Sequence, residues 1–108
     1  ILSGCPQWLL QTVVDYLGIR NVEVIGSQQQ ETQLGLIFTA HCFAENKLSM
    51  AKQAGHDMQH WGWGYSDSRA DLPFLNQCQT AYLINVKNRI KTDFAKKLTV
   101  AKQFIEWV

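Results

Sequence analysis

The chain has 108 residues, 46% of them hydrophobic, which suits one small core and a single domain. Ten basic residues stand against nine acidic ones, and this net charge of +1 does not give the strong positive field typical of nucleic-acid-binding proteins. No apolar run approaches the roughly 18 residues of a membrane span, and no signal-peptide pattern is present.

The three cysteines, Cys5, Cys42 and Cys78, are odd in number and show no C-x-x-C spacing. This pattern fits buried free thiols in a reducing compartment better than a disulfide framework. We therefore expect a cytoplasmic protein.

Residues 1–18 fit a strand that turns into a helix. The apolar start at residues 1–3 is followed by a Gly-Cys-Pro turn and by a helical pattern that stops at Gly18. The helix carries one apolar face, made of Leu9, Leu10, Val13, Val14 and Leu17. Ser3 is thereby predicted at the end of a strand before a helix N-terminus, where a hydroxyl can bond a phosphate oxygen.

A β-hairpin is predicted next. Residues 22–25 fit a strand, residues 28–33 are polar and turn-like, and residues 34–40 form a second apolar run. A helix is then expected to follow Cys42 and to end near Gly55, with Lys47 in its first turn. A lysine there opposes the helix dipole. Such a lysine is usually just exposed, but it is tolerable and useful if an anion lies opposite.

The histidines give little indication of a metal. His56 and His60 are four residues apart, but Gly55 and a strand expected from about Met58 argue against one helix that would present both to zinc. His41 is expected to be structural, near the end of the hairpin.

The stretch at residues 61–75 predicts a buried strand, a tight loop with two carboxylates and the start of a helix. Trp61, Trp63 and Tyr65 alternate with small residues, and Pro73 suits only the first turn of a helix. Asp67 and Asp71 then lie at the carboxyl edge of a strand, where open α/β sheets bind ligands and where carboxylates can hold Mg²⁺. The alternative is structural, with Asp71 as an N-cap and Asp67 as a loop acid.

The C-terminal third is predicted as a short helix at 72–78, a buried strand at 80–86 and a helix from Arg89. Helical spacing continues to Val108. Residues 87–108 hold six basic and two acidic residues, a local charge of +4. We favour the solvated face of a helix over contact with an anionic membrane surface.

Three segments resemble motifs of the haloacid-dehalogenase-like phosphatases, in the phosphoserine-phosphatase-like branch. Residues 64–75, Gly-Tyr-Ser-Asp-Ser-Arg-Ala-Asp-Leu-Pro-Phe-Leu, resemble the last motif, with Ser66 where many members have Gly, a difference of little expected consequence. Ser3 takes the Ser or Thr of the second motif, and Lys47 the lysine of the third, with Glu45-Asn46 in place of the usual Gly-containing lead-in. Residues 25–28, the hairpin with residues 42–47, and residues 64–68 are most similar to phosphatidylglycerophosphatase C-like proteins.

This resemblance implies a partial Rossmann-like, three-layer α/β fold with a mostly parallel sheet and a hairpin insertion. It also implies a Mg²⁺-dependent phosphomonoesterase that works through an aspartyl-phosphate. Asp67 would bind the metal, Asp71 would support the metal or orient the loop, Lys47 would neutralise phosphate charge and hold the nucleophile, and Ser3 would donate to a phosphate oxygen. The substrate would be a phosphorylated small molecule or a lipid phosphate such as phosphatidylglycerophosphate, with the protein cytoplasmic or peripheral to the inner membrane. The family would place a short strand at 104–108, where the spacing predicts helix.

The family's Asp-x-Asp-x-Thr nucleophile motif is absent from the sequence, because no two of its five aspartates are separated by one residue. The chain also begins at Ile1 rather than Met. We therefore expect residues 1–108 to be the C-terminal part of a hydrolase core domain, inactive alone and prone to self-association through an exposed edge. The alternative is a non-catalytic α/β module that binds phosphate-bearing ligands or other proteins.

Overall fold

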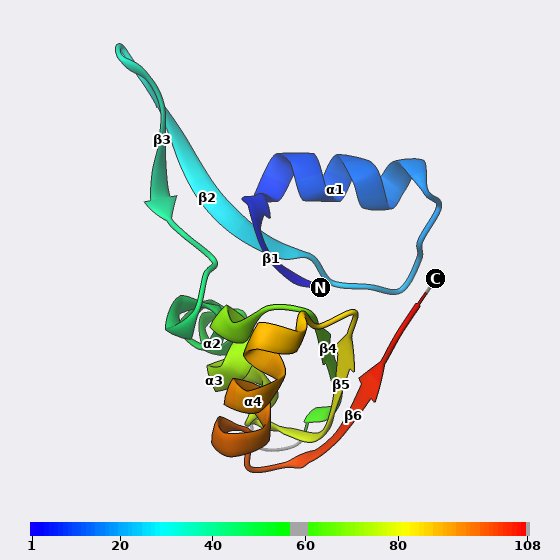
Figure 1. The fold of residues 1–108 in the computed structure, drawn as a ribbon. Helices are drawn as coiled ribbons and strands as arrows, with labels where there is room; N and C mark the ends of the chain where they lie inside the picture. Colours follow the sequence, from blue (N-terminus) through cyan, green and yellow to red (C-terminus); the bar gives the residue numbers. More distant parts are fainter. Residues whose placement is uncertain (57–60, 108) are drawn as a thin grey trace.

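The computed structural model describes residues 1–56 and 61–107 (Figure 1). In this part of the chain strands and helices alternate, and the six strands described form two three-stranded sheets rather than one. In chain order the elements are β1 (Leu2–Pro6), α1 (Gln7–Tyr16), β2 (Ile25–Thr32), β3 (Gly35–Ala40), α2 (Glu45–Gln53), β4 (Trp61–Ser66), a 3-10 helix (Arg69–Asp71), α3 (Leu72–Leu75), β5 (Cys78–Ile84), α4 (Asn88–Lys97) and β6 (Ala101–Ile105).

The strands are mostly parallel, as the α/β prediction requires. The first sheet has the order β1-β2-β3, in which β1 and β2 are parallel and β2 and β3 form the antiparallel hairpin. The second sheet has the order β4-β5-β6 and is parallel throughout. Helices α2, α3 and α4 gather on one side of the second sheet, whereas α1 lies against the first (Figure 1). The predicted fold class is therefore confirmed.

The main core lies between the second sheet and its helices. It is formed by side chains of α3, β5 and α4 and of the segments that flank α4, namely Leu75, Ala81, Leu83, Val86, Phe94 and Leu98. Ala81 and Leu83 alternate along β5, and Phe94 lies on the apolar stripe of α4, so strand and helix periodicities meet at this interface. Within the described residues no helix is long and apolar enough to cross a membrane.

The strand β4 exists as predicted, but the prediction that its aromatic residues are buried is wrong. Trp63 and Tyr65 are 70% and 57% exposed, while Gly64 is buried. A Cβ on Gly64 would lie 2.6 Å from Cys78 Sγ and 3.0 Å from Leu75 Cδ2. Gly64 therefore faces α3, which approaches β4 too closely at this point for a larger side chain. Trp63 and Tyr65, its neighbours in the alternation, point to the opposite face and are exposed.

Several predicted boundaries are corrected. The strand expected at 22–25 begins only at Ile25, and the polar residues expected to form a turn continue it to Thr32. They do so because each is paired with β3, from Gln28 with Ala40 to Thr32 with Gly35. The expected apolar face of α1 is largely exposed, with only Val14 buried.

The C-terminal corrections have a similar cause. The helix expected at 72–78 ends at Leu75, since Cys78 already begins β5. Helical spacing beyond Lys97 is misleading, because β6 pairs in parallel with β5 from Ala101 to Ile105. The strand implied by the family resemblance is therefore present at this end of the chain, although it lies at 101–105 rather than 104–108. His60 and the strand start near Met58 fall outside the described residues.

Candidate functional site

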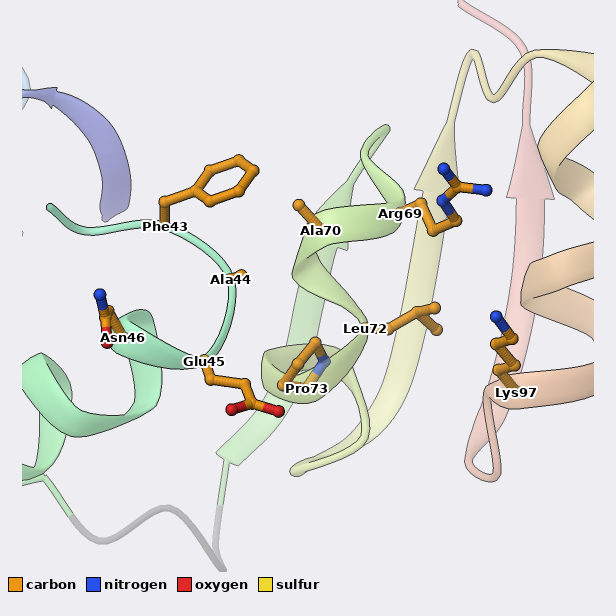
Figure 2. Close-up of a pocket in the computed structure, with 9 residues that line it drawn as sticks. All are labelled: Phe43, Ala44, Glu45, Asn46, Arg69, Ala70, Leu72, Pro73 and Lys97. Atoms are coloured by element: carbon orange, nitrogen blue, oxygen red, sulfur yellow. The ribbon is translucent and has the colours of Figure 1, made fainter.

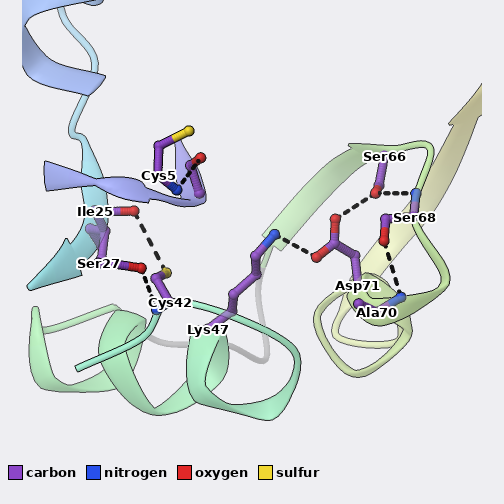
Figure 3. A network of polar contacts seen from close by, with 10 residues as sticks. Cys5, Ile25, Ser27, Cys42, Lys47, Ser66, Ser68, Ala70 and Asp71 are labelled. Carbon is purple, nitrogen blue, oxygen red and sulfur yellow. Dashed lines mark hydrogen bonds and ion pairs between the residues drawn. The ribbon is translucent and has the colours of Figure 1, made fainter. Parts of the chain in front are cut away.

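Lys47 and Asp71 form a buried ion pair between two parts of the chain that are 24 residues apart. The Lys47 Nζ donates to Asp71 Oδ1 at 2.5 Å, and the Lys47 residue is only 9% exposed (Figure 3). Lys47 lies in the first turn of α2, where its charge opposes the helix dipole. The carboxylate of Asp71 supplies the opposing anion, so the ammonium is buried with a partner rather than alone.

Asp71 is fixed by the loop that follows β4. It occupies the N-cap position of α3, but its side chain makes no capping bond. Its second oxygen, Oδ2, instead accepts a hydrogen bond from the Ser66 hydroxyl at 2.5 Å, and the Ser66 oxygen accepts one from the Ser68 backbone N–H at 3.0 Å (Figure 3). The side chain that caps this region is Ser68, whose hydroxyl accepts from the Ala70 N–H at 3.3 Å.

The loop before α2 is tied to β1 and β2 through a buried serine. The Ser27 hydroxyl donates to the Gly4 carbonyl at 2.8 Å and accepts from the Cys42 N–H at 2.9 Å. The Cys42 side chain is fully buried, and burial raises its thiol pKa, an effect that the nearby charge of Lys47 opposes. These bonds link the strand that carries Ser3 to the segment that carries Lys47.

The other two predicted site residues lie apart from the ion pair. Ser3 lies inside β1 rather than at its end, and its hydroxyl accepts from the Cys5 N–H at 3.1 Å. Asp67 is exposed and lines a cavity of about 310 Å³ with Tyr65, Asn85 and Trp107. In the described part of the chain, neither side chain bonds Lys47 or Asp71.

One hollow adjoins the ion pair. Lys47 and Asp71 line a cavity of about 410 Å³ whose other walls are Ile1, Leu2, Trp63, Gly64, Tyr65 and Phe74. It lies between β1 and β4, which are end strands of the two sheets.

A wider groove of about 560 Å³ separates the start of α2 from the 3-10 helix and the end of α4 (Figure 2). Its charged lining residues are Glu45, Arg69 and Lys97. Arg69 is paired with Asp93 at 2.8 Å, and this hydrogen bond is the main cause that lowers the Asp93 pKa.

The carboxylates of Asp67 and Asp71 are the predicted metal ligands, and they differ in how free their oxygens are. No group of three or more His, Cys, Asp or Glu side chains among the described residues is arranged to hold a metal ion. Mg²⁺ commonly takes one or two carboxylates and completes its shell with water and substrate phosphate. The exposed Asp67 carboxylate fits such a donor set, while both oxygens of Asp71 already accept hydrogen bonds.

The sequence of this region matches a known family. The model of the haloacid dehalogenase-like hydrolases matches residues 1–76. The chain belongs to this family. The matched region ends before β5 and spans the positions of Ser3, Lys47, Asp67 and Asp71. A comparison with solved structures found no match.

Ser66 is the residue whose importance sequence analysis missed. It was expected to replace Gly with little consequence, yet its hydroxyl bonds the Asp71 carboxylate. The available signal was a hydroxyl five residues before the second aspartate of the loop, a spacing that brings the two together only because the 3-10 helix folds back toward β4.

Proposed function

We propose that this chain is the C-terminal portion of a Mg²⁺-dependent phosphomonoesterase that acts through an aspartyl-phosphate. The observation that carries the proposal is the Lys47–Asp71 ion pair, because it holds a buried cation against a carboxylate of the segment that follows the carboxyl end of β4. Phosphoryl transfer depends mainly on positioning and charge neutralisation, and a preorganised ammonium in a site shielded from water supplies both.

Each predicted residue has a role in this proposal. Lys47 neutralises phosphate charge, and Asp71 holds the Lys47 ammonium in place. Asp67 offers its carboxylate to Mg²⁺, which when bound would polarise a phosphoryl oxygen. Ser3 donates a hydrogen bond to a phosphate oxygen, for which its hydroxyl must keep its acceptor bond from the Cys5 N–H and turn its own proton outward.

The nucleophile must come from an Asp-x-Asp-x-Thr segment outside these 108 residues, since the sequence contains no such motif. We therefore propose that the chain alone has no phosphatase activity. The alternative function is a non-catalytic module, in which the Lys47 ammonium would bind phosphate-bearing ligands but would not take part in their hydrolysis.

The test is hydrolysis of an aryl phosphate with and without Mg²⁺. Three proteins are compared: one that joins this sequence to an Asp-x-Asp-x-Thr segment, the same protein with Asp67→Asn, and the 108-residue chain. We expect the first to turn over only with Mg²⁺, and the other two to be inactive. Full activity of the Asp67→Asn protein would remove Asp67 from the metal site, and an inert joined protein would favour the binding module.

A lipid phosphate is the substrate class that we propose. Four basic side chains around α4 are exposed: Lys87, Arg89, Lys96 and Lys97. Cations near an anionic bilayer contribute roughly 1 kcal/mol each, so they can hold a hydrolase at a surface that presents phosphate headgroups. The fraction of the chain that co-sediments with vesicles should increase with their anionic lipid content. If this fraction does not depend on anionic lipid content, contact between the basic side chains and an anionic membrane surface is excluded.

A further inference from the structure

Both carboxylate oxygens of Asp71 accept hydrogen bonds, and each has a different donor. Oδ1 accepts from Lys47, while Oδ2 accepts from Ser66 at 2.5 Å. A carboxylate held by one bond can rotate about its χ2 angle, but two partners on its two oxygens fix the plane of the group. The position of the Lys47 ammonium therefore depends on the donor at the second oxygen.

The Ser66 hydroxyl is itself fixed in direction. Ser66 is the last residue of β4 and pairs with the buried Leu83 of β5, so its backbone belongs to the sheet. Its oxygen accepts the Ser68 N–H at 3.0 Å. A hydroxyl that accepts one bond has one proton to give, and in this geometry that proton is directed at Asp71.

We propose that Ser66 is a positioning residue that holds the Lys47 ammonium in the site through Asp71. This inference rests on the proposed function only for its consequence in catalysis, because the positioning itself follows from the hydrogen bonds. A hydrogen bond to an ionised acceptor is stronger than one between neutral groups. A glycine or alanine at position 66 would leave Asp71 Oδ2 without this donor and allow the Lys47–Asp71 pair to rotate toward solvent.

Ser68 provides a matched control in the same loop. Its hydroxyl accepts the Ala70 N–H and does not contact Asp71, although Ser68 is partly buried like Ser66. Removal of the Ser68 hydroxyl takes one backbone hydrogen bond from the loop. Removal of the Ser66 hydroxyl also takes one backbone hydrogen bond, from the Ser68 N–H, and in addition the bond to Asp71.

The experiment measures how fast each lysine of the 108-residue chain is acetylated by limiting acetic anhydride, with Lys47 compared with the exposed Lys52 by mass spectrometry. We expect Ser66→Ala to raise the relative rate at Lys47 about tenfold, the factor that 1.4 kcal/mol gives. Ser66→Thr keeps the hydroxyl and should restore the original rate, and Ser68→Ala should leave it unchanged. If Ser66→Ala fails to fold by circular dichroism, Ser66→Cys retains the volume with a weaker donor and should give an intermediate rate.

An unchanged rate in the folded Ser66→Ala or Ser66→Cys chain would overturn the proposal. An equal rise in Ser68→Ala would also overturn it, because the effect would then be general loosening of the loop. Acetylation in the presence of inorganic phosphate and Mg²⁺ separates this inference from the proposed function. If phosphate does not slow acetylation of Lys47 while Ser66→Ala still raises it, the positioning role stands and the phosphate site fails.

Discussion

The ion pair between Lys47 and Asp71 supplies the buried charge of the candidate site, and the stability of the chain depends on both partners being present. An ammonium in so buried a position is tolerated only because a carboxylate lies against it, with side chains 11% and 13% exposed. Loss of one partner from such a pair is far more costly than loss of both, since the remaining charge is left without compensation.

Asp71→Asn should therefore destabilise the chain by about 3 kcal/mol. Asp67→Asn is the matched control, because the same change at an exposed loop acid should stay within about 0.5 kcal/mol. Urea unfolding of both variants measures the difference. A double variant with Lys47→Met should recover part of the loss, and a single Asp71→Asn chain as stable as the original would contradict the role of the pair.

A second residue near the site has an unfavourable backbone conformation. Ala44 precedes α2 with φ 50 and ψ −127, in a region that L side chains seldom occupy. The lead-in to Lys47 therefore has the geometry of a glycine-containing turn although its sequence has no glycine.

Ala44→Gly should stabilise the chain by about 1 kcal/mol, because relief of the strain exceeds the extra entropy that glycine loses on folding. Ala54→Gly provides the opposite case at the other end of α2, where φ is −78, and should cost about 0.5 kcal/mol. Thermal unfolding would measure both shifts. Equal losses in the two variants would show that the positive φ of Ala44 carries no strain.

At the scale of elements, β4 shows what alternation can and cannot predict. The period of two predicted that a strand exists here, because alternation follows from backbone geometry. It could not tell which face is buried, and glycine rather than tryptophan faces the core. The short distance between α3 and β4 determines which face of the strand is buried. The sequence of residues 61–66 alone gives no indication of that distance.

The two glycines of β4 allow a direct test of this packing. Gly64→Ala should destabilise the chain by about 2 kcal/mol, because the new methyl overlaps Cys78 Sγ and Leu75 Cδ2. A Cβ on Gly62 meets no atom of the described residues within 4 Å, so Gly62→Ala should be neutral or slightly stabilising. Denaturant midpoints of both variants give the comparison. Cys78→Ala in the Gly64→Ala chain should recover part of the loss, and failure to do so would place the overlap elsewhere.

The ends of the other elements were predicted less well because tertiary pairing decided them. The glutamines of β2 have no apolar pattern and become a strand only through the ladder with β3. Residues 101–105 keep helical spacing yet join β5, since the edge of a parallel sheet offers hydrogen bonds that the end of α4 does not. Neither the pairing of β2 with β3 nor that of β6 with β5 can be predicted from the local sequence.

For the whole molecule, two of the predicted site residues, Lys47 and Asp71, form an ion pair although they are 24 residues apart. The motifs predicted each of them near the start of a helix, but they did not predict that the two side chains pair. The sequence could not predict that Ser3 and Asp67 bond neither of them within the described structure, nor that the sheet is divided between β1 and β4. Those features depend on how the two halves pack.

The division of the sheet leaves four end strands, and β3 is the most apolar of these. Its residues Leu36, Ile37 and Phe38 are all about half exposed or more, and residues 35–40 contain no charge and no proline. Natural proteins usually protect such edges with lysine, proline or a covering segment. We propose that the 108-residue chain associates with itself through β3, where a partner strand would meet only uncharged side chains.

Sedimentation of the chain should then show a mass that rises with concentration. Ile37→Lys should weaken the association at least about tenfold, equal to 1.4 kcal/mol, because a self-paired edge brings two like charges together. Gln53→Lys adds the same charge at the exposed end of α2 and should leave the association unchanged. A constant monomer mass would exclude self-association, and an equal loss in both variants would assign it to net charge. A loss confined to Ile37→Lys would identify β3 as the contact, because both variants add one positive charge to the chain but only Ile37→Lys changes β3.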